Sequence, residues 1–238
     1  EKVAELRKPE VKAQILSERQ EDHLMRSRVT QWSRIFPLGD PPDYEPAPEK
    51  SVAAMAARAG RTPEDLVYDL LLENDGKTIL YRPLSNYAYG DLSPVQDMMQ
   101  HPNSLVGLGD GGAHVGVLTD ASAFTYLLTH WTRDRSRGKK LPLEWAIKRL
   151  TRDNAEAIGL LDRGLLAVGK KADINIIDYE KLAICPPEVL YDLPAGGKRM
   201  VQRTRGYDAT IVAGEIVYRN GEPTDALPGR LVRGARAA

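Results

Sequence analysis

Residues 104–116 read SLVGLGDGGAHVG, and the rest of the chain is interpreted outward from this stretch. Its apolar beginning is too short for a helix and is bounded by glycine, which predicts a buried strand over 104–108. Asp110 stands at the carboxyl end of that strand, after Gly109, and opens a glycine-rich loop. In parallel α/β folds the catalytic groups stand at the carboxyl ends of the strands. The stretch therefore places Asp110 where a general base or a metal ligand is expected.

The loop after Asp110 is the expected substrate-binding element. Gly111 and Gly112 accept backbone angles that other residues resist, so a substrate can approach the main chain closely. His114 lies on the same loop and is expected to face the site. Asp followed by Gly is also a common turn pair, so a purely structural role for the loop remains an alternative.

Composition limits the class of protein. The 238 residues are 42% hydrophobic and 28% charged, which is typical of a globular protein. Because 33 basic side chains balance 33 acidic ones, nothing in the total charge favours nucleic acid or an anionic membrane. No apolar run is long enough to span a bilayer. The single cysteine, Cys185, excludes an intrachain disulfide and a thiolate cluster, and a cytoplasmic location is expected.

Before the central stretch the sequence predicts helices with clear capping signals. Caps are expected at Ser51 and Thr62, and a third helix is expected to start at Ser93 and Pro94. Short strands are expected over 29–33 and 78–81. Five prolines between residues 37 and 48 predict a long loop.

After the central stretch the pattern changes from helix to strand. Helices are expected over 121–131, 142–150 and 151–159, and the basic segment 133–140 is expected to be a solvated loop. From residue 164 onward the sequence predicts strands, which include 172–178 and a hairpin over 210–219. The predicted domains are therefore 1–163 and 164–238.

Several stretches, taken in order, resemble the amidohydrolase superfamily, and within it the C-terminal part of the N-acyl-D-amino-acid deacylases, or D-aminoacylases. The stretches that resemble it are 101–111, 154–164, 169–174, 212–217 and 228–230. This resemblance implies an α/β fold, namely the C-terminal portion of a metal-dependent (β/α)₈ TIM barrel followed by strands of a small β-sandwich domain. It also implies that Asp110 carries a proton from the attacking water to the leaving nitrogen and contacts one or two zinc ions.

The chain departs from that family at the metal ligands. The superfamily's other ligands come from earlier barrel strands, and the four histidines here, at 23, 101, 114 and 130, do not have ligand spacing. Where many D-aminoacylases offer an arginine, residues 119–121 read TDA. A (β/α)₈ barrel needs about 250 residues. We therefore expect a fragment or a subunit, completed by a missing N-terminal segment or a second polypeptide, in an oligomer.

Three functions are consistent with these features. The first is a metal-dependent hydrolase of a linear amide, with a small-molecule substrate bound by the loops 37–48, 84–91 and 111–120. The second is a cyclic amidohydrolase of the hydantoinase or dihydropyrimidinase type. The third is a non-catalytic assembly subunit. The aromatic residues Trp32, Tyr81, Tyr87 and Tyr89 are expected either to line an acyl pocket or to pack in the core.

Overall fold

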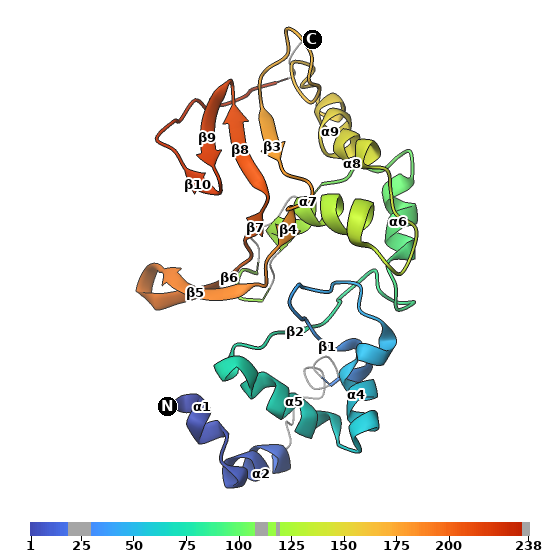
Figure 1. Cartoon of the computed structure of the whole chain (residues 1–238), viewed down its shortest axis with the longest axis vertical. Coiled ribbons are helices and arrows are strands. Elements are labelled where there is room, and N and C mark those ends of the chain that lie inside the picture. The colour runs from blue at the N-terminus through green and yellow to red at the C-terminus, as the bar shows by residue number, and fades with distance from the viewer. Residues whose placement is uncertain (19–29, 108–113, 118–119, 235–238) are drawn as a thin grey trace. The chain divides into compact units, whose positions relative to one another are not determined.

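The structure is a computed structural model that describes residues 1–18, 30–107, 114–117 and 120–234. These residues form a mixed α/β structure that divides into two compact units, Glu1–Val95 and Gln96–Ala238 (Figure 1). The predicted domain boundary after residue 163 lies inside the second unit and stays a prediction. None of the helices in the described ranges has the length and apolar character needed to cross a lipid bilayer.

The first unit consists of short helices around a two-stranded ribbon. Its core is built from Ile35, Val52, Ala56, Leu66 and Leu70. Its elements in chain order are α1 (Lys2–Leu6), α2 (Pro9–Ser17), a 3₁₀ turn (Trp32–Arg34), β1 (Phe36–Pro37), a 3₁₀ turn (Pro48–Lys50), α4 (Val52–Ala59), α5 (Pro63–Leu72), a 3₁₀ turn (Glu73–Gly76) and β2 (Leu80–Tyr81).

The capping signals read from the sequence at Ser51 and Thr62 are confirmed. The backbone N–H of Ala54 donates to Ser51 Oγ at 3.3 Å at the start of α4, and Gly60 ends that helix with φ +63°. The N–H of Asp65 donates to Thr62 Oγ1 at 3.3 Å at the start of α5. Each bond satisfies a backbone donor that the first helical turn leaves without a partner.

The strand expected over 29–33 is wrong within its described part, because Trp32–Arg34 form a 3₁₀ turn. Trp32 packs against the core and donates from Nε1 to Glu64 at 3.1 Å. The strand lies later, at β1, which pairs antiparallel with β2. Pro37 provides no N–H of its own, and the contact between the two segments continues at Leu38, whose N–H donates to the carbonyl of Ile79 at 3.1 Å.

The second unit begins with helices. They are α6 (Ser93–Gln100, which starts just before the unit boundary), a 3₁₀ turn (Asp120–Ser122), α7 (Ala123–Tyr126), a π-helix (Leu127–Asp134), α8 (Leu143–Leu150) and α9 (Arg152–Ala157). The predicted helix over 121–131 is thus confirmed and extends to Asp134. Leu127, Leu128 and Trp131 lie in the core of this unit.

The basic segment 133–140 is not a solvated loop at its start, so that expectation is wrong there. Arg135 is only 2% exposed, donates to Gln96 Oε1 at 2.6 Å and to the Lys139 carbonyl at 3.1 Å, and lies over the Trp131 ring at 4.6 Å. A buried guanidinium requires such acceptors, which a sequence count of charges does not reveal.

The strands of the second unit all pair antiparallel in the described residues. The main sheet has the order β10-β9-β8-β3. Its strands are β3 (Ile174–Ile177), β8 (Tyr207–Val212), β9 (Glu215–Arg219) and β10 (Glu222–Pro223). The predicted hairpin over 210–219 is confirmed as β8–β9, and Ala213 and Gly214 form its turn at positive φ. Two further pairs accompany it, β4 (Ala183–Ile184) with β7 (Thr204–Arg205) and β5 (Glu188–Leu193) with β6 (Gly197–Val201).

The strand expected over 104–108 is absent from its described part, residues 104–107. The carbonyls of Ser104 and Val106 accept hydrogen bonds from the side chains of Arg149 and Asn154, and Leu105 is 56% exposed. A strand forms by pairing with a neighbouring strand, and the described residues place none beside this segment. The described strands therefore do not close into a barrel.

Candidate functional site

Most of the predicted site lies outside the described residues. Asp110, Gly111 and Gly112 belong to the range 108–113, which the structure does not describe. His114 is described: it is exposed, has φ +50°, and its carbonyl accepts from the N–H of Val117 at 2.9 Å. A non-glycine residue with positive φ is uncommon and here belongs to a tight turn. The structure thus describes the residues on both sides of the Asp110 loop.

The histidines of the described ranges do not converge on a metal site. The Nδ1 of His101 accepts from the N–H of Asn103 at 3.2 Å, in the turn after α6. His130 stacks on Tyr126 with ring centroids 4.5 Å apart. Within the part of the chain that the structure describes, no three His, Cys, Asp or Glu residues group closely enough to hold a metal ion. These residues therefore do not fit a zinc site by themselves.

The segment leading to Asp110 is bound by two side chains from the helices α8 and α9. Arg149 Nη2 donates to the carbonyl of Ser104 at 2.5 Å, and Asn154 Nδ2 donates to the carbonyl of Val106 at 2.8 Å. Arg149 is kept in place by Asp153, which lies 3.3 Å from its Nη1. Hydrogen bonds from Lys148 and then from Arg149 lower the pKa of Asp153, so this carboxylate stays charged.

The segment after the loop is bound by β6 and the residue that follows it. The N–H of Met200 donates to the carbonyl of Val115 at 2.6 Å. Ser122 Oγ donates to Gln202 Oε1 at 2.5 Å, and Gln202 Nε2 donates to the carbonyl of Cys185 at 2.9 Å. The described residues on both sides of the Asp110 loop are therefore hydrogen-bonded to other elements of the second unit, namely α8 and α9 on one side and β6 on the other.

Sequence reasoning did not identify Arg149 or Gln202. Their contacts join residues 45 and 80 positions apart, and neither residue belongs to a local motif. Asn154 does belong to a stretch that resembles the amidohydrolases, although its contact with Val106 could not be read from that stretch.

The aromatic residues of the first unit differ in burial, and only the core role that the sequence allowed is seen. Tyr87 is buried, donates from its hydroxyl to the carbonyl of Pro46 at 2.5 Å, and meets Phe36 edge to face at 6.4 Å. Trp32 packs on the core. Tyr89 is 82% exposed. The core interpretation is thus confirmed for Tyr87 and Trp32, and an acyl pocket stays a prediction.

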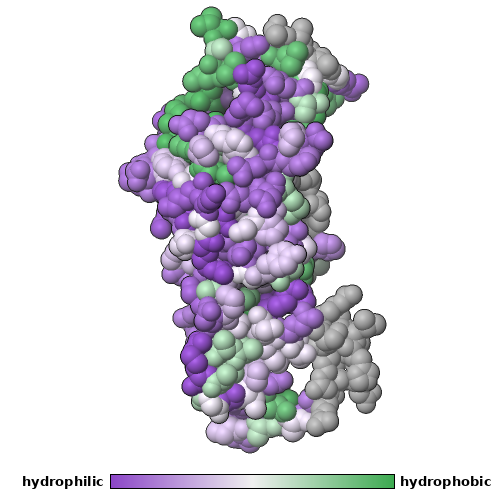
Figure 2. Space-filling view, turned by 90° about the vertical axis from the view of Figure 1, so that its right-hand side faces the viewer, coloured by the Kyte–Doolittle hydropathy of each residue, from purple (hydrophilic) through white to green (hydrophobic). Residues whose placement is uncertain are grey.

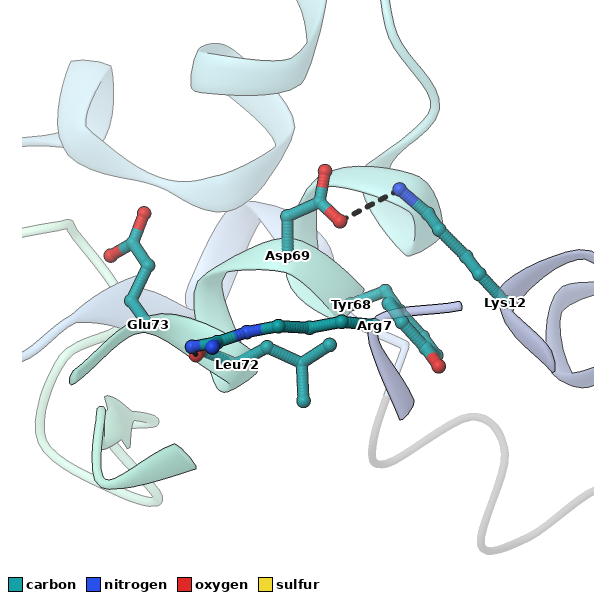
Figure 3. Close-up of a pocket in the computed structure, with 6 residues that line it drawn as sticks. All are labelled: Arg7, Lys12, Tyr68, Asp69, Leu72 and Glu73. Carbon is teal, nitrogen blue, oxygen red and sulfur yellow. Dashed lines mark hydrogen bonds and ion pairs between the residues drawn. The ribbon is translucent and has the colours of Figure 1, made fainter. Parts of the chain in front are cut away.

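A cavity of about 260 Å³ lies in the first unit beside α5 (Figure 3). It is lined by Arg7, Lys12, Tyr68, Asp69, Leu72 and Glu73. Arg7 donates to the carbonyl of Leu72 at 3.0 Å, and Lys12 lies 2.7 Å from Asp69. These polar groups join the segment of α1 and α2 to α5, so the cavity lies within the packing of these helices.

Two larger hollows lie in the second unit. One, of about 570 Å³, is polar and lies beside β7, β8 and β9. The other, of about 620 Å³, has a mainly apolar surface and lies between α8, residues 164–166 and β3, and charged side chains such as Glu144, Lys148 and Asp173 also line it. Leu166 is 85% exposed, and Val168 is fully exposed. Figure 2 shows hydrophobic surface gathered in the upper part of this unit. Such exposed apolar surface is typical of an interface.

Comparison with known proteins places these features in context. A family model described as the amidohydrolase family matches residues 1–218. The N-acyl-D-glutamate deacylase of Alcaligenes xylosoxydans xylosoxydans is 29% identical over 150 residues, covering 60% of this chain and 27% of the relative. The dihydroorotase of Lactobacillus acidophilus is 32% identical over 117 residues, covering 48% of this chain and 26% of the relative.

One solved structure also matches. The crystal structure of a D-aminoacylase aligns with 81% of this chain and 36% of its own length, with a TM-score of 0.42 and 22% identity. The aligned part of this chain covers less than a third of the length of the N-acyl-D-glutamate deacylase and of the dihydroorotase.

Proposed function

Since this chain belongs to the amidohydrolase family, as its motifs indicated, we propose that it is part of a hydrolase that cleaves the carbon–nitrogen bond of a linear amide. The observation that carries the proposal is the family match over residues 1–218. The deacylase relative, whose alignment covers 60% of this chain, supports the linear amide. The substrate class is then an N-acyl amino acid.

Asp110 is the proposed catalytic residue. A carboxylate within hydrogen-bond reach of the attacking water accepts its proton and then donates it to the leaving nitrogen. The hydrogen bonds from Arg149, Asn154 and Met200 support this role, because they hold the described chain on both sides of the Asp110 loop against α8, α9 and β6. His114, Gly111 and Gly112 are proposed to contact the substrate.

The metal is proposed to depend on residues outside this chain. One or two zinc ions are expected from the resemblance, with Asp110 as the ligand that this chain contributes. The described residues do not form a metal site, so no step of the reaction is derived through zinc.

A second polypeptide or a further segment is the proposed partner. A (β/α)₈ barrel needs about 250 residues, and this chain aligns with less than a third of its curated relatives. The exposed Leu166 and the apolar hollow beside α8 support an additional interface. We propose a cytoplasmic assembly of these parts, with a small amide as its substrate.

Native mass and metal content of the protein isolated from its source provide the first test. We expect a second polypeptide or a longer chain, together with about one or two zinc ions per site. A stable, metal-free particle of this chain alone, inactive on every amide, would contradict the catalytic proposal and support the assembly subunit.

Hydrolysis by the isolated assembly provides the second test. Asp110→Asn is expected to lower kcat about 10²- to 10⁴-fold, the usual contribution of a proton-transfer group, while the assembly stays intact. Asp97→Asn is the matched control, because Asp97 is an exposed acid on α6 and lies outside the loops that are expected to bind the substrate. Equal activity of both variants would remove Asp110 from the mechanism.

The cyclic-amide alternative is supported by the dihydroorotase relative. A panel that contains N-acyl-D-glutamate, other N-acyl amino acids, a hydantoin and a dihydropyrimidine separates the two. Turnover of only the cyclic compounds would replace the linear-amide proposal while leaving the family assignment intact.

A further inference from the structure

The helices α1 and α2, which the structure describes in full, contain no buried residue. The side chains of Val3, Leu6 and Val11 are only half-buried, while Ile15 is 41% and Leu16 38% exposed. The core of the first unit lies instead between residues 32 and 80. Burial of apolar surface is the main favourable contribution to helix packing in water, so another kind of contact must hold α1 and α2 in place.

Lys12 of α2 makes the charged contacts with α5. Its Nζ lies 2.6 Å from Asp65 and, as Figure 3 shows, beside Asp69, at 2.7 Å. The two aspartates are four residues apart on one face of α5, where like charges repel each other. Arg61 pairs with both of them and so balances one of the two negative charges. Lys12 balances the other, and without it this face of α5 has a net negative charge.

Two hydrogen bonds to backbone carbonyls complete the attachment. The hydroxyl of Tyr68 donates to the carbonyl of Leu6 at 2.6 Å, and Arg7 Nη2 donates to the carbonyl of Leu72 at 3.0 Å. The cavity of about 260 Å³ lies among these side chains and Lys12 (Figure 3). Polar groups therefore cross a contact that the apolar side chains leave partly empty.

We propose that α1 and α2 form a strap that opens from α5 as one piece while the core of the first unit stays folded, and that the ion pairs of Lys12 hold it closed. Elements with few buried apolar contacts are those that open at low free energy. Because salt screens partly exposed ion pairs, ionic strength sets how often the α5 surface with Tyr68 and Leu72 is uncovered. This device belongs to the fold of the first unit and is independent of the proposed hydrolysis.

Hydrogen–deuterium exchange reports this opening, because the strap cannot keep its helices when it leaves α5. The helix α1 has five residues and α2 has nine, and helices of that length are not stable alone in water. An open strap therefore loses the backbone hydrogen bonds that protect its amides. Amides of α4 and α5 keep theirs, since the core residues Val52, Ala56, Leu66 and Leu70 belong to these helices.

Exchange of the full chain at low and at high ionic strength tests the role of Lys12. Lys12→Met is expected to raise exchange of the α2 amides about three- to tenfold at low salt, since it removes two partly exposed ion pairs. Salt at about 1 M is expected to have a similar effect on the unaltered chain and little effect on Lys12→Met. Lys12→Arg keeps the charge and is expected to keep the protection. Unchanged exchange in Lys12→Met, or an equal effect of salt on both chains, would overturn the proposal.

Lys8→Met is the matched control. Lys8 lies between the two helices and pairs with Glu5, three residues earlier, in an exposed contact within the strap itself. Its loss is expected to change exchange of α2 by no more than about twofold. An equal rise in Lys8→Met and Lys12→Met would show that removal of any charge loosens the helices, and it would exclude a specific role for the contact with α5.

Thiol labelling distinguishes release of the strap from unfolding of its helices in place. Leu72→Cys provides a thiol beside the cavity, and Cys185 in the second unit is the internal reference. In a chain that carries Leu72→Cys, adding Lys12→Met should accelerate labelling at position 72 by the same factor as exchange of α2, with Cys185 unchanged. Faster exchange without faster labelling would mean that the helices unfold without leaving α5. Loss of protection in α2 and α5 together would mean that the whole unit opens, and either result would overturn the proposal.

Discussion

Gly206, between β7 and β8, is the position where a single added methyl group has the clearest consequence. A Cβ there would lie 2.6 Å from the Cα and 2.7 Å from the N of Leu182, which is itself completely buried. Gly206 also has φ +95°, which side chains of L-residues rarely adopt. Because the colliding atoms are backbone, no rotamer change relieves the overlap. We therefore expect Gly206→Ala to destabilise the second unit.

The loss of stability expected for Gly206→Ala has two sources, which a control variant separates. Positive φ costs an alanine about 1–2 kcal/mol, and forced overlap in a packed interior adds about 1–3 kcal/mol. Gly214, in the β8–β9 turn, has φ +87° with no atom within 4 Å of an added Cβ. Gly214→Ala is therefore expected to cost only the first amount. The difference between the two variants measures the contact with Leu182.

Native-state hydrogen exchange is the suitable assay, because it reports on the second unit alone. The N–H of Asp178 donates to the carbonyl of Gly206 at 2.9 Å, so its protection reports directly on this junction. Exchange at Asp178 should accelerate about tenfold for each 1.4 kcal/mol lost. Equal protection in the Gly206→Ala and Gly214→Ala chains would refute the reasoning, since the overlap would then have no energetic effect.

Two further predictions concern charged side chains. Hydrogen bonds from Arg61 and Lys12 lower the pKa of Asp65 to about 2 from its ordinary 3.8, so its contribution to stability is present above pH 4 and is lost as the pH falls toward 2. Melting temperatures of the natural chain and of Asp65→Asn should therefore differ at pH 7 and converge near pH 2, and a constant difference would contradict this. Arg135→Met should lower the free energy of unfolding of the second unit by about 1.5–3 kcal/mol in urea titrations, because it removes charged hydrogen bonds to Gln96 and Lys139. Arg203→Met, which alters an exposed ion pair, should cost at most about 1 kcal/mol, and an equal loss in both variants would contradict the role of burial.

Helices were predicted from the sequence with good boundaries because their signals are local. Ser51 and Thr62 bind backbone groups three residues away, and Gly60 ends α4 through its own φ. The β8–β9 hairpin is local in the same sense, since its turn and its alternating residues are adjacent in the chain. Such features need no knowledge of the rest of the fold.

Strands without a local partner could not be predicted in this way. The apolar run at 104–107 has the composition of a buried strand, yet its carbonyls are bound by Arg149 and Asn154. The pairing of β1 with β2 joins residues more than 40 positions apart, and its position depends on where Trp32 packs. Composition indicates a preference for extended backbone, whereas pairing requires a neighbour that composition does not identify.

The candidate site depends both on features that are local in the sequence and on contacts between residues far apart in the chain. Asp110 and its glycines are conspicuous in the sequence, but Arg149 and Gln202, which bind Ser104 and Ser122 in the described chain on either side, lie 45 and 80 residues from the atoms they bind. Gln202 in turn depends on Cys185 for its orientation. The described chain on either side of the Asp110 loop is therefore held by contacts from α8 and from the β6 segment. A variant that loosens β6 should disturb the Asp110 flank before it disturbs the β8–β9 hairpin, which is the order that hydrogen exchange can resolve.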